Sequence, residues 1–134
     1  MKKQFLLFAF TALMVVSIIS CSKDKTTTQS NNANIQGKWS GTLTPAVGPR
    51  PYFATTFNSD GSLRVEQNNI NTPDVATGTW TITGNTVKAT YTFSGAITGT
   101  YSLIGTYTSS PDQINGTVGT GTSTSGYADF SVSK

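Results

Sequence analysis

From residue 35 onward, apolar and polar side chains alternate with a period of two, which is typical of β-strands that bury one face. In the first such segment Trp39 and Leu43 share one face, while Ser40 and Thr42 share the other. No segment carries the apolar stripe of an amphipathic helix. The pattern predicts eight strands, over residues 35–43, 53–57, 63–66, 76–83, 87–93, 101–107, 114–118 and 128–132.

The connections between these strands are mostly short. Asn58–Gly61 and Ser110–Asp112 read as turns, and Gly84-Asn85 reads as a two-residue hairpin loop. Consecutive hairpins predict an antiparallel meander, and eight meandering strands close readily into a barrel. A two-sheet β-sandwich satisfies the same alternation, but the long crossover connections of a Greek key are missing. The prediction is a single all-β, eight-stranded, antiparallel up-and-down barrel, with a β-sandwich as the alternative.

The predicted inner face carries large rings beside very small residues. Glycines and alanines such as Gly41, Gly78 and Ala89 would leave room among the rings for a small apolar ligand. Alternatively, the rings simply fill the space, as they do in many small barrels. The candidate ligand-lining residues are Trp39, Phe53, Phe57, Trp80, Tyr91, Tyr101 and Tyr107.

A glycine two places before an aromatic residue recurs along the chain. Gly37-Lys38-Trp39 resembles the glycine-x-tryptophan that opens lipocalins and related calycins. Phe57–Gly61 followed by Gly78–Asn85 is similar to small lipocalin-like domains of bacterial lipoproteins. The resemblance spans residues 35–134 and implies a barrel with a cup for an apolar molecule. Lipocalins usually add a late arginine across the first-strand tryptophan, where this chain has only Lys134, and a helix after the barrel, which it lacks.

The first 20 residues have the order of a secretory signal peptide. Lys2 and Lys3 precede an apolar run of 15 residues, which is shorter than the roughly 20 that span a bilayer as a helix. The run ends in Ile18-Ile19-Ser20-Cys21, which resembles the lipobox of bacterial lipoproteins and implies cleavage before Cys21 and acylation of that residue. We expect a signal peptide at 1–20, a flexible tether at 21–34 and the barrel domain at 35–134.

Composition agrees with an exported β-protein and argues against some partners. The chain has 24 threonines, which favour a pleated, half-exposed surface. Without residues 1–20 it keeps seven basic and six acidic residues, so no basic stripe remains that would follow a nucleic acid backbone. Cys21 is the single cysteine, so the domain has no internal disulfide.

The residues that usually carry catalysis are scarce. Histidine is absent, and lipidation would occupy Cys21, which excludes Ser–His, Cys–His and most zinc arrangements. The carboxylates lie in the tether, in predicted turns or on outward faces, where burial does not tune a pKa for acid–base work. We therefore expect no enzyme, no catalytic residues, no metal site and no cofactor.

The sequence therefore predicts a lipoprotein attached to the membrane of the bacterial envelope through acyl chains on Cys21. Ser22 after the cysteine favours the outer membrane, by resemblance to sorting signals. Two functions stay open. The barrel binds a small apolar ligand, or it is a filled structural module that contacts an envelope protein or glycan. For the second function, the proline-rich loop around Val47 and Arg50 is a candidate contact patch.

Overall fold

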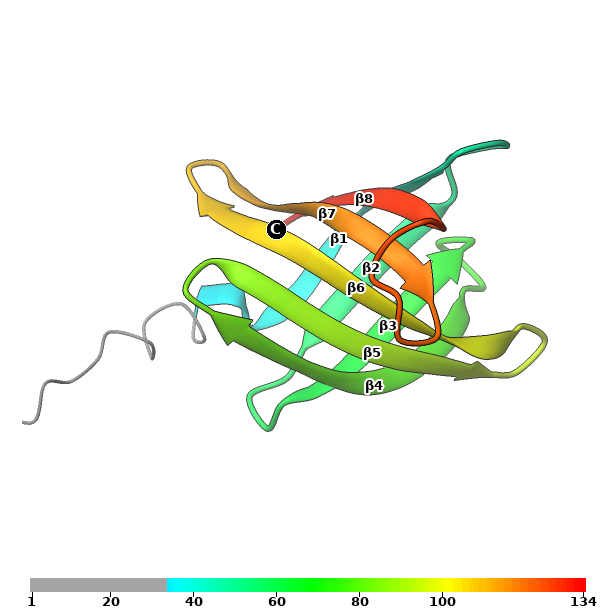
Figure 1. The fold of residues 1–134 in the computed structure, drawn as a ribbon, viewed down its shortest axis with the longest axis horizontal. Coiled ribbons are helices and arrows are strands. Elements are labelled where there is room, and N and C mark those ends of the chain that lie inside the picture. The colour runs from blue at the N-terminus through cyan, green and yellow to red at the C-terminus, as the bar shows by residue number, and fades with distance from the viewer. Residues whose placement is uncertain (1–33) are drawn as a thin grey trace, which may run out of the picture.

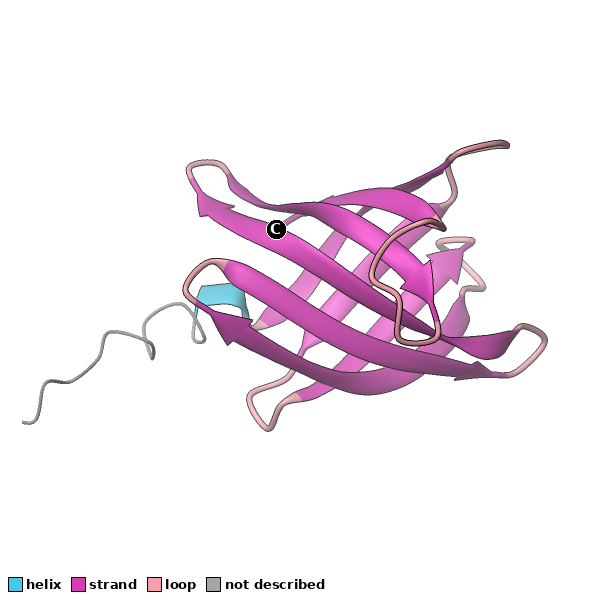
Figure 2. Cartoon of the chain, viewed as in Figure 1, coloured by secondary structure: helices cyan, strands magenta, loops and turns pink. Residues whose placement is uncertain are grey.

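A computed structural model describes residues 34–134, so the predicted signal peptide, Cys21 and tether residues 21–33 lie outside the described part. Residues 34 and 35 are helical, and the described chain that follows is built from antiparallel strands and their connections (Figures 1 and 2). The strands are β1 Gly37–Pro45, β2 Tyr52–Phe57, β3 Ser62–Asn68, β4 Asp74–Thr83, β5 Thr86–Ser94, β6 Thr98–Ser109, β7 Asp112–Thr120 and β8 Ala128–Ser133.

Each strand pairs with its neighbours in sequence, and the first strand also pairs with the last. β1 places Trp39 opposite Thr55 of β2, and further along it places Leu43 opposite Phe130 of β8. The sheet is thereby a closed eight-stranded barrel. The predicted up-and-down barrel is confirmed, and the β-sandwich alternative is wrong, because all eight strands belong to one sheet that closes between β1 and β8.

The period of two places the apolar side chains inside. In β5, Val87, Ala89, Tyr91 and Phe93 are buried, and every residue between them is exposed. The other strands follow the same rule with few exceptions. The buried core contains Ile35, which precedes β1, and residues from all eight strands: Trp39, Leu43, Phe53, Phe57, Leu63, Val65, Ala76, Trp80, Val87, Ala89, Tyr91, Phe93, Leu103, Tyr107, Ile114, Val118, Ala128, Phe130 and Val132.

The barrel has two dissimilar ends. One end, here called the loop end, carries the short connection 95–97 and the three longest connections, 46–51, 69–73 and 121–127 (Figure 1). The other end, here called the floor, carries the tight turns 58–61, 84–85 and 110–111 together with the two ends of the described chain. This division follows from an even number of strands in an up-and-down order.

Several side-chain contacts at the floor converge on Trp39. Its side chain is fully buried, and its indole Nε1 donates a hydrogen bond of 2.6 Å to the carbonyl of Ile35. The ring meets Tyr107 edge-on, with centroids 5.9 Å apart. Lys134 Nζ lies 5.1 Å from the centroid of the Trp39 ring and donates to the carbonyl of Asn34 at 2.6 Å. Lys134 thus connects the C-terminal end of the barrel to the residues that precede β1.

The inward glycines mark close approaches between strands. A Cβ built on Gly41 would overlap the carbonyl oxygen of Ser131, and one on Gly78 would overlap that of Thr90. A Cβ on Gly105 would lie 2.9 Å from side-chain atoms of Ile114 and Phe130. The expectation that small residues leave room for a ligand is wrong at these positions, because neighbouring backbone or side chains already take the space.

Gly78→Ala should destabilise the barrel strongly, because the added methyl group would collide with backbone that has no alternative position. We expect the free energy of unfolding to fall by about 3 kcal/mol or more, measured by urea denaturation. Gly95→Ala is the matched control, since a Cβ there meets nothing within 4 Å and the change should stay within about 1 kcal/mol of wild type. Equal effects of the two substitutions would contradict this account.

Candidate functional site

The candidate ligand-lining residues do lie on the inner face of one barrel. Six of the seven are buried, with exposed fractions of 0–6%, and only Tyr101 is half-buried. They come from β1, β2, β4, β5 and β6, so the strand pairing brings together residues that are up to 68 positions apart in sequence. All seven side chains therefore belong to the core or pack against it, and their role in lining a ligand site stays a prediction.

These rings contact one another rather than enclosing a space. Phe57 meets Trp80 with centroids 5.2 Å apart, and Phe53 meets Phe130 at 5.7 Å. Trp80 is held further by its indole nitrogen, which donates to the carbonyl of Asn58 at 3.0 Å. Such edge-on and tilted packing is the arrangement of a hydrophobic core. Through the floor and the middle of the barrel, the rings fill the interior.

The loop end contains a second aromatic cluster with a different property. Tyr91 packs against Phe93 and stacks on Tyr101, both at 5.8 Å between centroids, and Tyr101 contacts Tyr127 at 5.1 Å. The Tyr91 hydroxyl is buried and has no hydrogen-bond partner within residues 34–134. Burial raises the pKa of this hydroxyl well above its ordinary value of 10.0, and the hydroxyls of Tyr127 and Tyr101 add to the rise.

Tyr91 is not the only inner-face residue with an orphaned hydroxyl. Thr55 Oγ1, on β2, is also buried without a partner. An unsatisfied buried hydroxyl costs free energy, typically about 1–3 kcal/mol. Tyr107 shows the usual arrangement, because its hydroxyl donates to Asp112 Oδ1 at 3.0 Å. Among the described residues, the Tyr91 and Thr55 hydroxyls are thus the buried side-chain polar groups that lack a hydrogen-bond partner.

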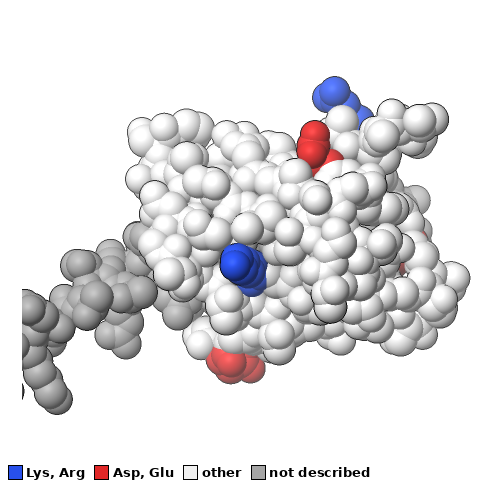
Figure 3. Space-filling model, viewed as in Figure 1, with Lys and Arg blue, Asp and Glu red and all other residues white. Residues whose placement is uncertain are grey.

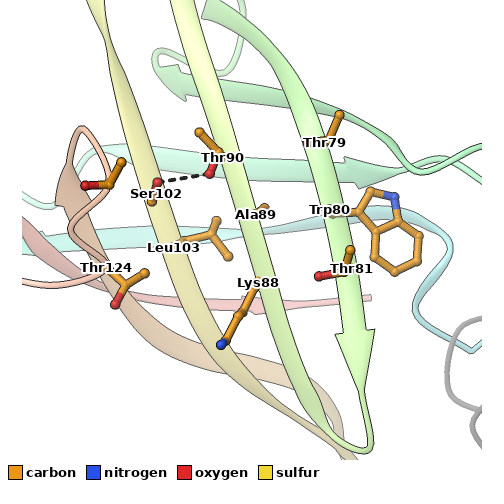
Figure 4. A pocket seen from close by; sticks show the side chains of 10 residues that line it. Thr79, Trp80, Thr81, Lys88, Ala89, Thr90, Ser102, Leu103 and Thr124 are labelled. Atoms are coloured by element: carbon orange, nitrogen blue, oxygen red, sulfur yellow. Dashed lines mark hydrogen bonds between the residues drawn. The ribbon is translucent and has the colours of Figure 1, made fainter.

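A groove of about 250 Å³ lies on the outer wall, across β4, β5 and β6 (Figure 4). We call it the wall groove. Ala89 and Leu103 line it although both residues are buried, and Lys88 lies on the exposed face of β5. The connection between β7 and β8 forms one side. The lining residues are Thr79, Trp80, Thr81, Lys88, Ala89, Thr90, Ser102, Leu103, Thr122 and Thr124.

Hydrogen bonds hold the β7–β8 connection against the wall. Ser102 Oγ donates to the carbonyl of Gly121 at 2.7 Å, and Thr117 Oγ1 donates to the carbonyl of Thr124 at 2.7 Å. The amide of Gly121 also donates to the carbonyl of Thr100 at 2.8 Å. The groove is therefore built into the fold, although its loop is a run of glycine, threonine and serine that looks unstructured in sequence.

The charged side chains of the described residues are few and lie at the surface (Figure 3). Glu66 accepts from Lys38 at 2.7 Å and from Arg64 at 3.1 Å. Its pKa is lowered mainly by the hydrogen bond from Lys38, whose own pKa is raised by the same bond. Asp60 caps its turn by accepting from the amide and hydroxyl of Ser62, and these bonds lower its pKa. These carboxylates have structural partners.

Two further observations concern residues 34–134 alone. No group of three potential metal ligands gathers there. No helix in this range is long and apolar enough to cross a membrane.

The proline-rich loop between β1 and β2 is exposed, and its role as a contact patch stays a prediction. Val47 is 90% exposed, and Ile70 of the β3–β4 loop, at the same end, is 67% exposed. A shallow hollow separates the β1–β2 loop from the β7–β8 connection and is bordered by Pro45, Tyr127 and Asp129.

Sequence reasoning missed Tyr127 and the wall groove. Tyr127 directly precedes β8, where alternation from Ala128 would direct it outward. Ser102 lies on the outer face of β6 yet is 4% exposed, because the β7–β8 connection covers it. Neither feature has a local signal, since both depend on a loop that folds back across strands distant in sequence.

Comparison with protein-family models, with curated proteins and with solved structures found no match. The function must therefore be inferred from the residues and their geometry.

Tyr91→Phe should stabilise the protein, because it removes a buried hydroxyl without a partner and keeps the ring. We expect the free energy of unfolding to rise by about 1 kcal/mol in urea at pH 7. Tyr107→Phe is the matched control and should lower it by about 1 kcal/mol, since the bond to Asp112 is lost. A loss of stability in Tyr91→Phe would indicate that its hydroxyl does have a partner.

The Tyr91→Phe variant also tests how the stability of the protein depends on pH. Above pH 10 a tyrosine in the unfolded chain ionises, while folded Tyr91 stays protonated because burial raises its pKa. The unfolded state then binds fewer protons, so stability falls as the pH rises. Tyr91→Phe should lose less stability than wild type between pH 9 and 11, measured by thermal melts. Parallel curves for the two proteins would contradict the assignment.

Proposed function

We propose that this protein is a lipid-anchored lipoprotein of the bacterial envelope whose filled barrel acts through its outer surface. The signal-peptide order of residues 1–20 and the lipobox-like sequence before Cys21 support the anchor. Ser22 after the cysteine favours the outer membrane. The role is that of a non-enzymatic module for contact with another envelope component, a protein or a glycan.

The observation that carries this proposal is the packing of the inner face. The side chains that would line a cup are instead paired with one another, with Trp39, Phe53 and Phe57 at most 2% exposed. Inward glycines add no room, because adjacent strands approach closely there. A barrel filled in this way offers its outer wall and its loops as binding surfaces.

A second function, binding of a small apolar ligand, is favoured by one specific observation. The Tyr91 hydroxyl is buried without a partner beneath Tyr101 and Tyr127 at the loop end. A ligand that displaced these two rings would reach the hydroxyl with a hydrogen-bond acceptor. Such a ligand would need an apolar body of modest size and one polar atom.

The anchor is tested by replacing Cys21. Wild-type protein, expressed with its own leader in a Gram-negative host, should sediment with the outer membrane and carry the added mass of acyl chains. Cys21→Ser should lose both properties, because the acylated residue is gone. Sedimentation of Cys21→Ser with membranes, or an unmodified mass for wild type, would overturn the lipoprotein assignment.

Native mass spectrometry of the full-length protein, freed of detergent in the gas phase, distinguishes the two functions. A filled barrel should give the mass of the acylated chain and nothing more. A retained small molecule from the host would favour the ligand-binding function, and Tyr91→Phe should then reduce its occupancy. Tyr107→Phe, whose hydroxyl is bonded to Asp112, should leave the occupancy unchanged.

A further inference from the structure

The outer wall of β4, β5 and β6 carries hydroxyls in rows. Thr79, Thr90 and Ser102 are paired across the three strands, and Thr77, Thr92 and Thr100 form the next row toward the loop end. Neighbours in a row lie about 4.8 Å apart, and rows are separated by roughly 6.8 Å, as the pleat of a β-sheet requires. The wall therefore presents a regular array of small groups that both donate and accept hydrogen bonds.

The hydrogen bonds at the base of the wall groove determine which of two hydroxyls is the donor. Ser102 Oγ uses its only proton on the carbonyl of Gly121. The 3.0 Å contact between Ser102 and Thr90 therefore requires Thr90 to be the donor (Figure 4). Thr90 is left with acceptor capacity toward the groove. A ligand in the groove can thus satisfy Thr90 only with a donor, such as its own hydroxyl.

The charge of the groove points to an acidic ligand. Lys88 is the single charged residue among those that line it, and within residues 34–134 its ammonium makes no ion pair or hydrogen bond. Lys38 differs, because Glu66 neutralises it at 2.7 Å. An unpaired cation beside hydroxyls favours a ligand that brings a negative charge.

We propose that the wall groove binds an acidic saccharide, a sugar that carries both hydroxyls and a carboxylate or phosphate. The sugar hydroxyls pair with Thr79, Thr81 and Thr90, and the anionic group pairs with Lys88. Threonine methyl groups cover part of the wall and contact the apolar faces of sugar rings. This inference rests on the proposed function, for which it names the partner class.

The shape of the groove suits a segment of a longer chain. Its volume of about 250 Å³ lies below the roughly 300–1,000 Å³ of pockets that enclose drug-sized ligands. It is an open groove, so both ends of a bound oligosaccharide can continue along the wall. Envelope polysaccharides present this chemistry close to the site where an anchored barrel would lie.

The test uses the full-length protein in detergent micelles and three probes: trigalacturonate, which carries carboxylates, the neutral galactotriose, and galactose 6-phosphate. Binding is followed by isothermal titration calorimetry at low salt and at 0.5 M salt. We expect trigalacturonate to bind and galactotriose to bind at least threefold more weakly. Binding of galactose 6-phosphate as well would show that the anion, rather than the carboxylate, is recognised.

Variants locate the binding. Lys88→Gln should weaken trigalacturonate by about threefold and remove most of the salt dependence, as expected for an exposed ion pair. Thr79→Val keeps the shape of the side chain and should weaken both trisaccharides by about threefold to tenfold. The matched controls are Lys38→Gln and Thr42→Val, which both lie on β1, away from the β4–β6 wall, and should bind as wild type does.

Three results would overturn the inference: no binding of trigalacturonate at millimolar concentration, equal binding of the neutral trisaccharide, or equal weakening by the control variants. Failure here is distinguishable from failure of the proposed function. An acylated, membrane-bound protein with no retained small molecule and no saccharide binding would remain an envelope interaction module with a different partner. Loss of the anchor or a retained apolar molecule would instead refute the proposed function itself.

Discussion

Closure of the sheet between β1 and β8 is the constraint on which the rest of the structure depends. An eight-stranded barrel is narrow, so its strands must coil tightly and its interior must be filled by the side chains that point inward. Gly41 and Gly78 permit this coiling because a Cβ at either position would overlap a neighbouring backbone. Closure also pairs every strand on both edges, which removes the exposed edges that promote aggregation.

Because side chains fill the interior, the barrel offers its outer surface for binding. Rings that could have lined a cup pack against each other, and Trp39 is further fixed beneath Lys134 at the floor. The outer wall, in contrast, keeps hydroxyls and the cation Lys88 in positions that the sheet register fixes. Two interior hydroxyls depart from this division, those of Thr55 on β2 and of Tyr91 near the loop end, because both are buried without a hydrogen-bond partner.

The fold was predictable because its signal is local and repeated. Alternation of apolar and polar residues identified all eight strands, and short turns such as Gly84-Asn85 predicted their order. The inner-face position of Trp80 and Tyr91 followed from the same rule. Whether those rings enclose a space depends on how closely distant strands approach, which alternation does not report. The wall groove was not predictable for the same reason, because Ser102 is covered by a loop that follows it by about twenty residues.

The contact between Lys134 and the carbonyl of Asn34 brings the two ends of the described barrel together. Because this bond measures 2.6 Å, the two ends of the described barrel lie within the length of one lysine side chain. A short linker can therefore join them, and new termini can be opened in the exposed β3–β4 loop around Ile70 without breaking a strand. The barrel is thus a candidate for circular permutation, which would place a fused domain or label at the opposite end of the molecule.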